Sequence, residues 1–328
     1  MTDYEASMTE TATIFAPSRA ALTIAVLVLP HSSILEVASI LDPMRAANRH
    51  LGQDAYRWRV VSPDGQAVPL TCGIELPSSG DLRAAEGADA LILVVGYRQS
   101  EVATKPLLRD LRRIAPRFAL IAGVDAAPWV MARAGLLDGH RATVHWEDQE
   151  DFAAAHPQVD TVPDRWVIDR ARATAGGAAP AHDLMLHLIA ARHGAALARQ
   201  VAQSFLTTIR DGHEPQVAPP TRDPRLDPRV AEAVARMEAR LDTPEPAARI
   251  ARAVGLSPRR MEVLFRASLG LTPAAYALSL RLQAARRMVT DTRHPLTEIA
   301  LRTGFSSQSA LSRAFRQHFG TAPSALRR

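Results

Sequence analysis

An aspartate occupies a sharp predicted turn in this sequence. The apolar residues 118–122 end at Gly123, a helix-like stretch rich in small residues covers 126–137, and Asp125 lies between them. Several hydrolase folds present a Ser or Cys nucleophile on such a strand-to-helix turn, which we call the elbow (residues 123–127). An Asp at this position leaves two possibilities: an enzyme, or a binding pocket built on an enzyme's frame.

A second set of candidate residues lies in an internal repeat near the C-terminal end. Residues 250–276 align with residues 299–326, and each copy has a helix, a turn at a Gly, and a second helix that mixes apolar residues with Arg and small polar residues. This pattern is typical of a helix-turn-helix, whose second helix lies in a DNA major groove. The matching pairs are Ile250/Ile299, Ala251/Ala300, Gly255/Gly304 and Ser257/Ser306 at an offset of 49, and Phe265/Phe315, Arg266/Arg316, Gly270/Gly320 and Pro273/Pro323 at an offset of 50.

Charge is distributed unevenly along the chain. The net charge of the whole chain is +5, yet residues 226–328 contain 17 Arg and 8 Asp or Glu, a balance of +9, and the remaining residues carry −4. A basic C-terminal segment favours an anionic partner such as nucleic acid. By charge alone, a solvated Arg-rich helical face is an equally good interpretation.

Length and composition predict two domains in a reducing compartment. A chain of 328 residues, 47% of them hydrophobic, has room for about two domains of ~150 residues each. Cys72 is the only cysteine, so no disulfide is possible and a cytoplasmic location is expected; a buried, apolar position is favoured for its side chain. The apolar runs are too short to cross a membrane. Residues 1–20 lack the basic start of a secretion signal, and we expect a flexible tail.

The elements that must position these residues differ between the two parts of the chain. Residues 21–210 alternate apolar runs with helical spacing, which favours a mostly parallel sheet with helices on both faces, a flavodoxin-like α/β sandwich. Prolines are dense over 211–228, so residues 211–225 are expected to form a linker before an all-α domain at 226–328. We expect strands at 22–29, 56–68, 88–96, 118–123, 142–148 and 166–170, and helices at 33–48, 180–194, 195–210, 227–241 and 274–291.

The segment GFSSQSALSRAFRQHFGTAPSALR, residues 304–327, resembles the C-terminal signature of the AraC/XylS transcription regulators. Together with both repeats and the connecting helix, the resemblance covers residues 226–328. It implies a unit that binds double-stranded DNA with two helix-turn-helices. Position by position, it assigns base reading to Arg259, Arg260 and Val263 in the first copy and to Gln308, Ser309, Ser312 and Arg313 in the second.

Most of these side-chain types suit the reading of bases. Arg can bond both acceptors of guanine, and Gln can pair with adenine. Val263 departs from its relatives, which often carry a polar residue or Arg there, and it could only touch a thymine methyl group. Arg266 and Arg316 are better explained as phosphate contacts or solvated residues. The residues expected to form the core of the repeat are Leu256, Met261, Leu264, Phe265, Phe305, Leu311, Phe315 and Phe319.

Residues 21–210 resemble the ThiJ/PfpI fold, a class I glutamine-amidotransferase-like α/β sandwich, and most closely the GlxA-type regulators that fuse it to an AraC-type domain. Residues 132–147 and 176–194 carry the resemblance. Enzymes of this fold place a Cys at the elbow, often beside a His, whereas Asp125 and Ala126 stand in those places here. The resemblance therefore implies that the frame is retained and that the chain is not an enzyme.

A pocket is expected at the carboxyl ends of the strands, where open α/β sheets bind ligands. Glu36 stands in the place of the acidic residue that supports the Cys in relatives, which would put it in the same pocket as Asp125. Two carboxylates would favour a cationic ligand, or one would be protonated, and aromatic faces can bind a cation. The GlxA-type relatives include sensors of glycine betaine, carnitine and arginine-type metabolites, which implies an amine, a betaine or a basic amino acid as effector. The candidate ligand-binding residues are His31, Glu36, Tyr97, Asp125, Ala126, Trp129 and Trp146.

Structural roles compete with several of these assignments. For Trp146, packing against the sheet is the better explanation, while Trp129 and His145 fit a structural role and a pocket role equally well. His182, His187 and His193 lie on one predicted helix without sharing a face. No group of His, Cys or carboxylate residues has a zinc-type spacing, so we expect neither a metal nor a cofactor.

Together these patterns predict a cytoplasmic, sequence-specific transcription regulator without a membrane segment. We expect an activator that binds a small-molecule effector, pairs as a homodimer, and works with RNA polymerase at promoter DNA. The alternative is an amidase- or hydratase-type enzyme that uses Asp125 and Glu36, which the missing Cys disfavours. A third possibility is an architectural DNA-binding protein that senses nothing, and a ligand that stabilises the first domain would exclude it.

Overall fold

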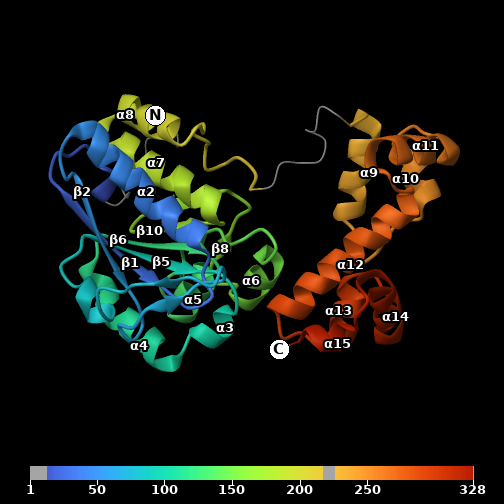
Figure 1. Cartoon of the computed structure of the whole chain (residues 1–328), viewed down its shortest axis with the longest axis horizontal. Helices are drawn as coiled ribbons and strands as arrows, with labels where there is room; N and C mark the ends of the chain where they lie inside the picture. Colours follow the sequence, from blue (N-terminus) through green and yellow to red (C-terminus); the bar gives the residue numbers. More distant parts are fainter. Residues whose placement is uncertain (1–12, 217–225, 328) are drawn as a thin grey trace. The chain divides into compact units, whose positions relative to one another are not determined.

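The computed structural model describes residues 13–216 and 226–327. The chain divides into two compact units, residues 1–217 and residues 218–328. Figure 1 shows an α/β unit, coloured blue to yellow, and an all-helical unit, coloured orange to red. The predicted combination of an α/β domain followed by a helical domain is confirmed.

A six-stranded sheet forms the centre of the first unit, in the order β2–β1–β5–β6–β10–β9. Neighbouring strands are parallel except for the antiparallel pair β10–β9 at one edge, which agrees with the predicted flavodoxin-like class. The strands are β1 (Leu22–Val28), β2 (Tyr56–Val61), β5 (Ala90–Val95), β6 (Leu120–Asp125), β9 (Trp166–Asp169) and β10 (Arg172–Ala175), with two short pairs outside the sheet, β3 (Val68–Pro69) with β4 (Glu75–Leu76) and β7 (Arg141–Ala142) with β8 (Asp160–Thr161).

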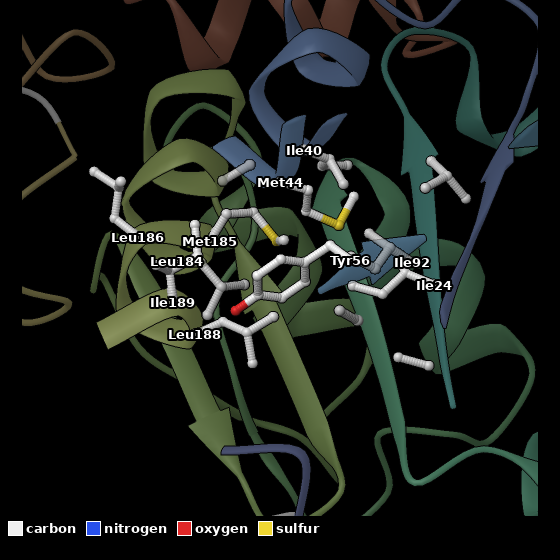
Figure 2. Close-up of a cluster of buried hydrophobic side chains, with 14 of the residues drawn as sticks. Ile24, Ile40, Met44, Tyr56, Ile92, Leu184, Met185, Leu186, Leu188 and Ile189 are labelled. Carbon is white, nitrogen blue, oxygen red and sulfur yellow. The ribbon is translucent and has the colours of Figure 1, made fainter. Parts of the chain in front are cut away.

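Helices cover both faces of the sheet (Figure 1). Along β1, Ile24 and Val26 belong to the core on one face, while Ala25 and Leu27 belong to the core on the other. Because both faces are buried, β1 is a continuous apolar run in the sequence. Figure 2 shows the first core, where side chains from the sheet meet those of the covering helices. The first core is covered by α2 (Ile34–Leu51), α7 (Ala178–His193) and α8 (Ala195–Ser204), and the second by α4 (Lys105–Ile114), α5 (Ala127–Arg133) and α6 (Gln149–Ala155).

Several predicted elements end earlier than their sequence patterns indicated, among them the strand expected over 56–68, which ends at Val61, and the helical stretch 126–137, which ends at Arg133. The strand expected over 142–148 is wrong beyond Ala142, because the Thr143 N–H donates to Thr174 Oγ1 (2.8 Å) and the following chain bonds to the elbow instead of to a neighbouring strand. The helix expected over 195–210 ends at Ser204. Leu206 adopts a φ of +53°, which lies outside the right-handed helical region.

The N-terminal segment is folded from residue 13 onward. Thr13–Phe15 form a short 3-10 helix, and the side chains of Ile14 and Phe15 are buried in the first core. The Arg192 guanidinium donates to the carbonyls of Ile14 (3.1 Å) and Ala20 (2.8 Å). The flexible tail expected over residues 1–20 is therefore wrong for residues 13–20, and the prediction for residues 1–12 lies outside the described residues.

The expected linker also begins too early. Residues 211–216 bond to the first unit: the Arg165 N–H donates to the Gly212 carbonyl (2.7 Å), and Asp164 and Pro215 form an antiparallel bridge. The proline pattern did not reveal these bonds, because an extended segment at a sheet edge tolerates Pro. The remainder of the expected linker, residues 217–225, lies outside the described residues.

The second unit consists of helices arranged as two similar halves. A first small core surrounds Phe265 and a second surrounds Phe315, and both side chains are fully buried. The long helix α12 contributes to both cores, since Leu280 packs against the first and Leu282 belongs to the second. The helices are α9 (Pro228–Glu238), α10 (Ala247–Ala253), α11 (Pro258–Leu269), α12 (Pro273–Asp291), α13 (Leu296–Arg302), α14 (Gln308–Phe319) and α15 (Pro323–Leu326).

No single helix in the described ranges is both long and apolar enough to cross a membrane. Two helices joined at a bend, Pro258–Leu269 and Pro273–Thr290, reach that length and apolarity only as a pair.

Candidate functional site

The elbow has a strained backbone at the residue that the sequence singled out. Strand β6 ends at Asp125, whose φ is +64°, and α5 begins two residues later. A residue other than Gly rarely adopts this conformation, and such strain concentrates at functional sites. Gly123 permits the close crossing of strand and helix, because a Cβ there would lie 2.6 Å from Met131 Sδ. The Ala126 N–H then donates to the Val95 carbonyl (2.8 Å), which fixes the turn against β5.

The structure brings Glu36 and Asp125 together. Their carboxyl groups are hydrogen-bonded to each other, and the Glu36 side chain is buried in the first turn of α2. Its carboxylate also accepts the Ser33 N–H (3.2 Å), which closes a capping box with Ser33. Gly96 leaves room for this approach, since a Cβ there would lie 2.8 Å from the His31 carbonyl and 3.5 Å from Glu36 Oε1.

Burial governs the protonation of this pair. Loss of solvent raises the pKa of Glu36, and it raises the pKa of Asp125 well above its usual range. The next largest cause for Asp125 is the hydrogen bond that its protonated carboxyl donates to Glu36. Two carboxyl groups in hydrogen-bond contact cannot both be ionised without a large repulsion, so they share one proton. The elbow therefore presents one titrating pair in place of a nucleophile.

A third carboxyl group, Asp148, belongs to the same corner. Burial raises the pKa of Asp148, whose charge in turn raises the pKa of Asp125. Between them lies His145, whose N–H donates to the Asp125 carbonyl (3.3 Å) and whose charge lowers the pKa of both carboxyl groups. Sequence reasoning missed Asp148. Its signal was its place three residues after His145, which was itself a candidate.

The aromatic candidates divide into one buried and two exposed residues. Trp129 is 8% exposed, its indole N–H donates to Asp148 Oδ2 (3.1 Å), and its ring packs edge-on against Phe152. Trp129 therefore holds Asp148 in place, and its ring has no exposed face that a ligand could contact. Tyr97 and Trp146 are 51% and 46% exposed, so the expectation that Trp146 packs in the core is wrong.

The remaining candidates lie on the loops around this corner. His31 follows β1 with a φ of +67°, and its carbonyl accepts the Tyr97 N–H (3.2 Å), so these two residues belong to neighbouring loops. Ala126 is buried inside the elbow. Cys72 is exposed, which contradicts the buried position expected for it.

A separate hollow of about 410 Å³ lies between the N-terminal parts of α2 and α7 and the chain after α8. Leu35, Ala38 and Phe205 give it apolar walls. A buried ion pair between Arg165 and Asp183 (2.7 Å) also lines it. None of the candidate ligand-binding residues from the sequence lines this hollow.

The two helix-turn-helices have the same frame. Helices α11 and α14 begin after Ser257 and Ser307, whose hydroxyl oxygens accept the N–H groups of Arg260 (3.2 Å) and Ala310 (3.1 Å). The counterpart of Ser257 is therefore Ser307 and not Ser306, so the extra residue of the second copy falls before this cap. Gly255 and Gly304 both have a φ of +70°, which explains the Gly in each turn.

The predicted reading residues lie on the outer side of these helices. Six of them are exposed and Ser312 is half-buried; the exposed ones are Arg259, Arg260, Val263, Gln308, Ser309 and Arg313. On α11 the sequence reasoning missed Glu262, which precedes Val263 and pairs with Arg266 at 2.8 Å. An acidic side chain repels DNA phosphates, so the outer side of α11 is less suited to DNA than that of α14.

Arg281 of α12 holds the second helix-turn-helix and was also missed. Its guanidinium donates to the carbonyls of Thr303 (2.7 Å) and Gly304 (2.6 Å) and lies 4.2 Å from the centre of the Phe305 ring. Burial lowers the pKa of Arg281. A single side chain thus satisfies two carbonyls just beyond the end of α13 and orients the turn that leads to α14.

Comparison with known proteins agrees with this architecture. Residues 23–191 match the DJ-1/PfpI family and residues 250–328 match a helix-turn-helix domain family. The chain is 36% identical over 302 residues to the HTH-type transcriptional regulator CdhR of Pseudomonas aeruginosa, covering 91% of this chain and 89% of that one. It is 30% identical to the HTH-type transcriptional regulator GlxA of Rhizobium meliloti, covering 95% of this chain and 97% of that one.

Solved structures resemble the first unit. An AraC family transcriptional regulator from Pseudomonas putida is 27% identical with a TM-score of 0.52, covering 56% of this chain and 99% of that one. A ThiJ/PfpI family protein from Pseudomonas syringae, 18% identical with a TM-score of 0.52 and covering 84% of this chain and 97% of that one, shows the same fold. These findings confirm the resemblances drawn from the sequence, and the relatives are named as regulators rather than enzymes. The chain belongs to the DJ-1/PfpI family and is a DNA-binding transcription regulator of the kind that joins such a domain to an AraC-type helix-turn-helix domain.

Proposed function

We propose that the first unit is a sensor domain that binds a small effector with a cationic nitrogen at the elbow, and that this binding controls the regulator's action on DNA. The observation that carries the proposal is the hydrogen-bonded pair of Glu36 and Asp125 at a strained turn. Strain and buried charge of this kind reduce stability, and such features concentrate at functional sites.

The protonation of the pair supports a cationic ligand. Burial raises the pKa of Glu36, Asp125 and Asp148, which means that the protonated forms of these three carboxyl groups are favoured. A cationic nitrogen nearby would lower all three values and replace the shared proton. Such a ligand would bind more tightly as pH rises, because the carboxyl pair then gives up its proton at smaller cost. The exposed Tyr97 and Trp146 could add aromatic contacts to a quaternary ammonium group.

The same site argues against catalysis by the chain. The elbow residue is Asp125, and its protonated or hydrogen-bonded carboxyl is a weak nucleophile. A pair of carboxyls that shares a proton can nevertheless act as acid and base, so an amidase- or hydratase-type activity is the second candidate. Turnover of a simple amide or nitrile by the full chain, lost in Asp125→Ala, would establish that candidate and replace the sensor proposal.

In the second unit, we propose that α11 and α14 read promoter DNA with Arg259, Arg260, Val263, Gln308, Ser309, Ser312 and Arg313. The exposure of these side chains and the basic balance of residues 226–328 support direct contact with bases and phosphates. We further propose that the regulator is an activator, pairs as a homodimer on two half-sites, and works there with RNA polymerase. Its DNA partner places it in the compartment that holds the chromosome.

A thermal-shift screen of the full chain tests the effector site. The probes are agmatine, choline, glycine betaine, carnitine and arginine, each at pH 6 and pH 8. We expect saturable stabilisation by one cationic class, stronger at pH 8, and at least tenfold weaker binding in Asp125→Asn and Glu36→Gln. The matched control is Asp54→Asn, which changes an exposed carboxylate. Stabilisation by neutral amides or anions alone would contradict the proposal.

A further inference from the structure

The last described residues of the first unit, 212–216, are bound along its edge. The Arg165 N–H donates to the Gly212 carbonyl (2.7 Å), and its guanidinium donates to the Gln216 carbonyl (3.3 Å). Gly212 is required by a close approach, since a Cβ there would lie 2.7 Å from the Trp166 carbonyl and 3.1 Å from its indole ring. The chain therefore leaves the sensor domain only after Gln216, although α8 ends at Ser204.

The side chain of Gln216 fastens this segment. Its Nε2 lies 2.9 Å from each of three acceptors: Thr143 Oγ1, the Val144 carbonyl and the Asp164 carbonyl. An amide nitrogen carries only two hydrogens, so the three acceptors share them. The Gln216 Oε1 is buried and has no hydrogen-bond partner among the described residues. The carboxamide is thus held in one orientation with an unmet bonding requirement, which suits an attachment that must open.

Gly176 provides the space for the Gln216 carboxamide. A Cβ at Gly176 would overlap the carboxamide carbon, nitrogen and oxygen of Gln216. Gly176 is absent from the glycines with a positive φ, so its backbone conformation would accept another residue. The need for Gly at this position therefore comes from the approach of Gln216.

The attachment of Gln216 is joined to the elbow through one short segment. Val144 accepts a hydrogen bond from Gln216, and the next residue, His145, donates its N–H to the Asp125 carbonyl (3.3 Å). Any movement of the elbow that displaces His145 also displaces an acceptor of Gln216.

We propose that residues 212–216 form a latch that sets where the chain leaves the sensor domain. The hydrogen bonds of the Gln216 carboxamide close the latch, and a movement of the elbow opens it. The proposal rests on the proposed effector site and homodimer. Release would free the chain from Leu206 onward. At ~3.3–3.6 Å per extended residue, the eleven residues 206–216 add at most roughly 36–40 Å of reach, about one turn of DNA. The latch would therefore decide which half-site spacing the paired regulator spans.

Hydrogen exchange of the full chain tests the latch without an effector. In Gln216→Ala and Gly176→Ala, we expect peptides covering 207–216 and the Arg165 amide to exchange at least tenfold faster than in the wild type. Peptides from β1 report whether the sensor domain remains folded. The matched control is Gln203→Ala, an exposed glutamine on α8. Unchanged exchange in both latch variants, with β1 protected, would overturn the proposal.

DNA binding tests the consequence. On an in vitro selected site with two half-sites, we expect insertion of one helical turn between them to weaken wild-type binding at least tenfold and the latch variants less than threefold. If the wild type and the latch variants lose affinity equally when the half-sites are moved apart, the latch does not set the reach of the regulator. Sedimentation of the full chain shows whether it is a monomer or a dimer. A monomer would refute the proposed homodimer but not the latch, because hydrogen exchange tests the latch independently. If agmatine stabilises the chain but leaves exchange of 207–216 unchanged, release from the elbow is refuted; if agmatine fails to stabilise it, the effector site is in doubt and the latch result stands.

Discussion

The elbow and the two reading helices hold their candidate residues in opposite ways. At the elbow, Glu36 is buried, Asp125 and Asp148 are half-buried, and the three interact with one another or with the residues behind them. On α14, Arg313 is exposed while Phe315, two residues later, is fully buried. In the proposed function, the same side chains at the elbow therefore serve both function and stability, whereas the two tasks are separated onto two faces of α11 and of α14.

The two helix-turn-helices sharpen this contrast, because their buried residues are alike and their exposed residues differ. Phe265 and Phe315 are buried alike, but Glu262 and Val263 of α11 correspond to Ser312 and Arg313 of α14. Only the second copy has the Arg281 clamp on its turn. We therefore expect α14 to read more of the DNA sequence and α11 chiefly to add affinity.

The largest expected effect comes from the shared frame. Phe315→Ala should remove about 3–5 kcal/mol from the free energy of unfolding of the second unit, because it leaves a cavity in a small core, and Phe265→Ala should cost a similar amount. All four Trp residues lie in the first unit, so in urea unfolding Trp fluorescence reports the first unit, and the far-UV circular dichroism change that Trp fluorescence does not follow reports the second. A cost below about 1 kcal/mol for either variant would refute the duplicated frame.

A smaller effect is expected on the outer face of α14. Arg313→Ala should weaken specific DNA binding by ~1–3 kcal/mol and relax the preference at one base pair, while stability changes by less than about 0.5 kcal/mol. Val263→Ala is the matched change on α11 and should cost less. Fluorescence anisotropy on selected and scrambled DNA measures both. An equal loss on every sequence would make Arg313 a phosphate contact.

The smallest expected effect, a shift of stability with pH, belongs to the elbow. The folded-state pKa values of Glu36 and Asp125 are raised, so their contribution to stability is present at low pH and is lost as pH rises through those values. Asp125→Asn removes one of the titrating groups. Its melting temperature should match the wild type near pH 5 and exceed it by a few degrees, roughly 2–4 °C per kcal/mol, near pH 8. A difference that is constant with pH would show that the pair does not share a proton.

The same contrast explains what the sequence could predict. The helix-turn-helices were foreseeable because buried and exposed residues alternate along α11 and α14, with a Ser cap at the start of each. The strand-to-helix turn at Asp125 was foreseeable from an apolar run that ends at Gly123. The proton sharing with Glu36 and the role of Asp148 were not, because they depend on the path of residues 143–148. That segment has a strand-like pattern, yet its N–H groups bond to Thr174 and to the elbow.

Sequence patterns also failed where short segments pack against the sensor domain. Ile14 and Phe15 look like part of a polar tail, but the Arg192 guanidinium donates hydrogen bonds to the carbonyls of Ile14 and Ala20 and so holds the chain against the core. Residues 211–216 look like a linker, since nothing local reveals that Gly176 leaves space for Gln216. In both cases the decisive contact is with a residue more than thirty positions away.

The most direct test of the account is whether the elbow controls DNA binding. Anisotropy of the full chain on its selected DNA is measured with and without the strongest cationic stabiliser from the probe panel, for the wild type and for Asp125→Asn. The account predicts that the ligand changes the apparent Kd at least threefold for the wild type and leaves the variant unchanged. The same change in both proteins would contradict it and would exclude Asp125 from the effector site.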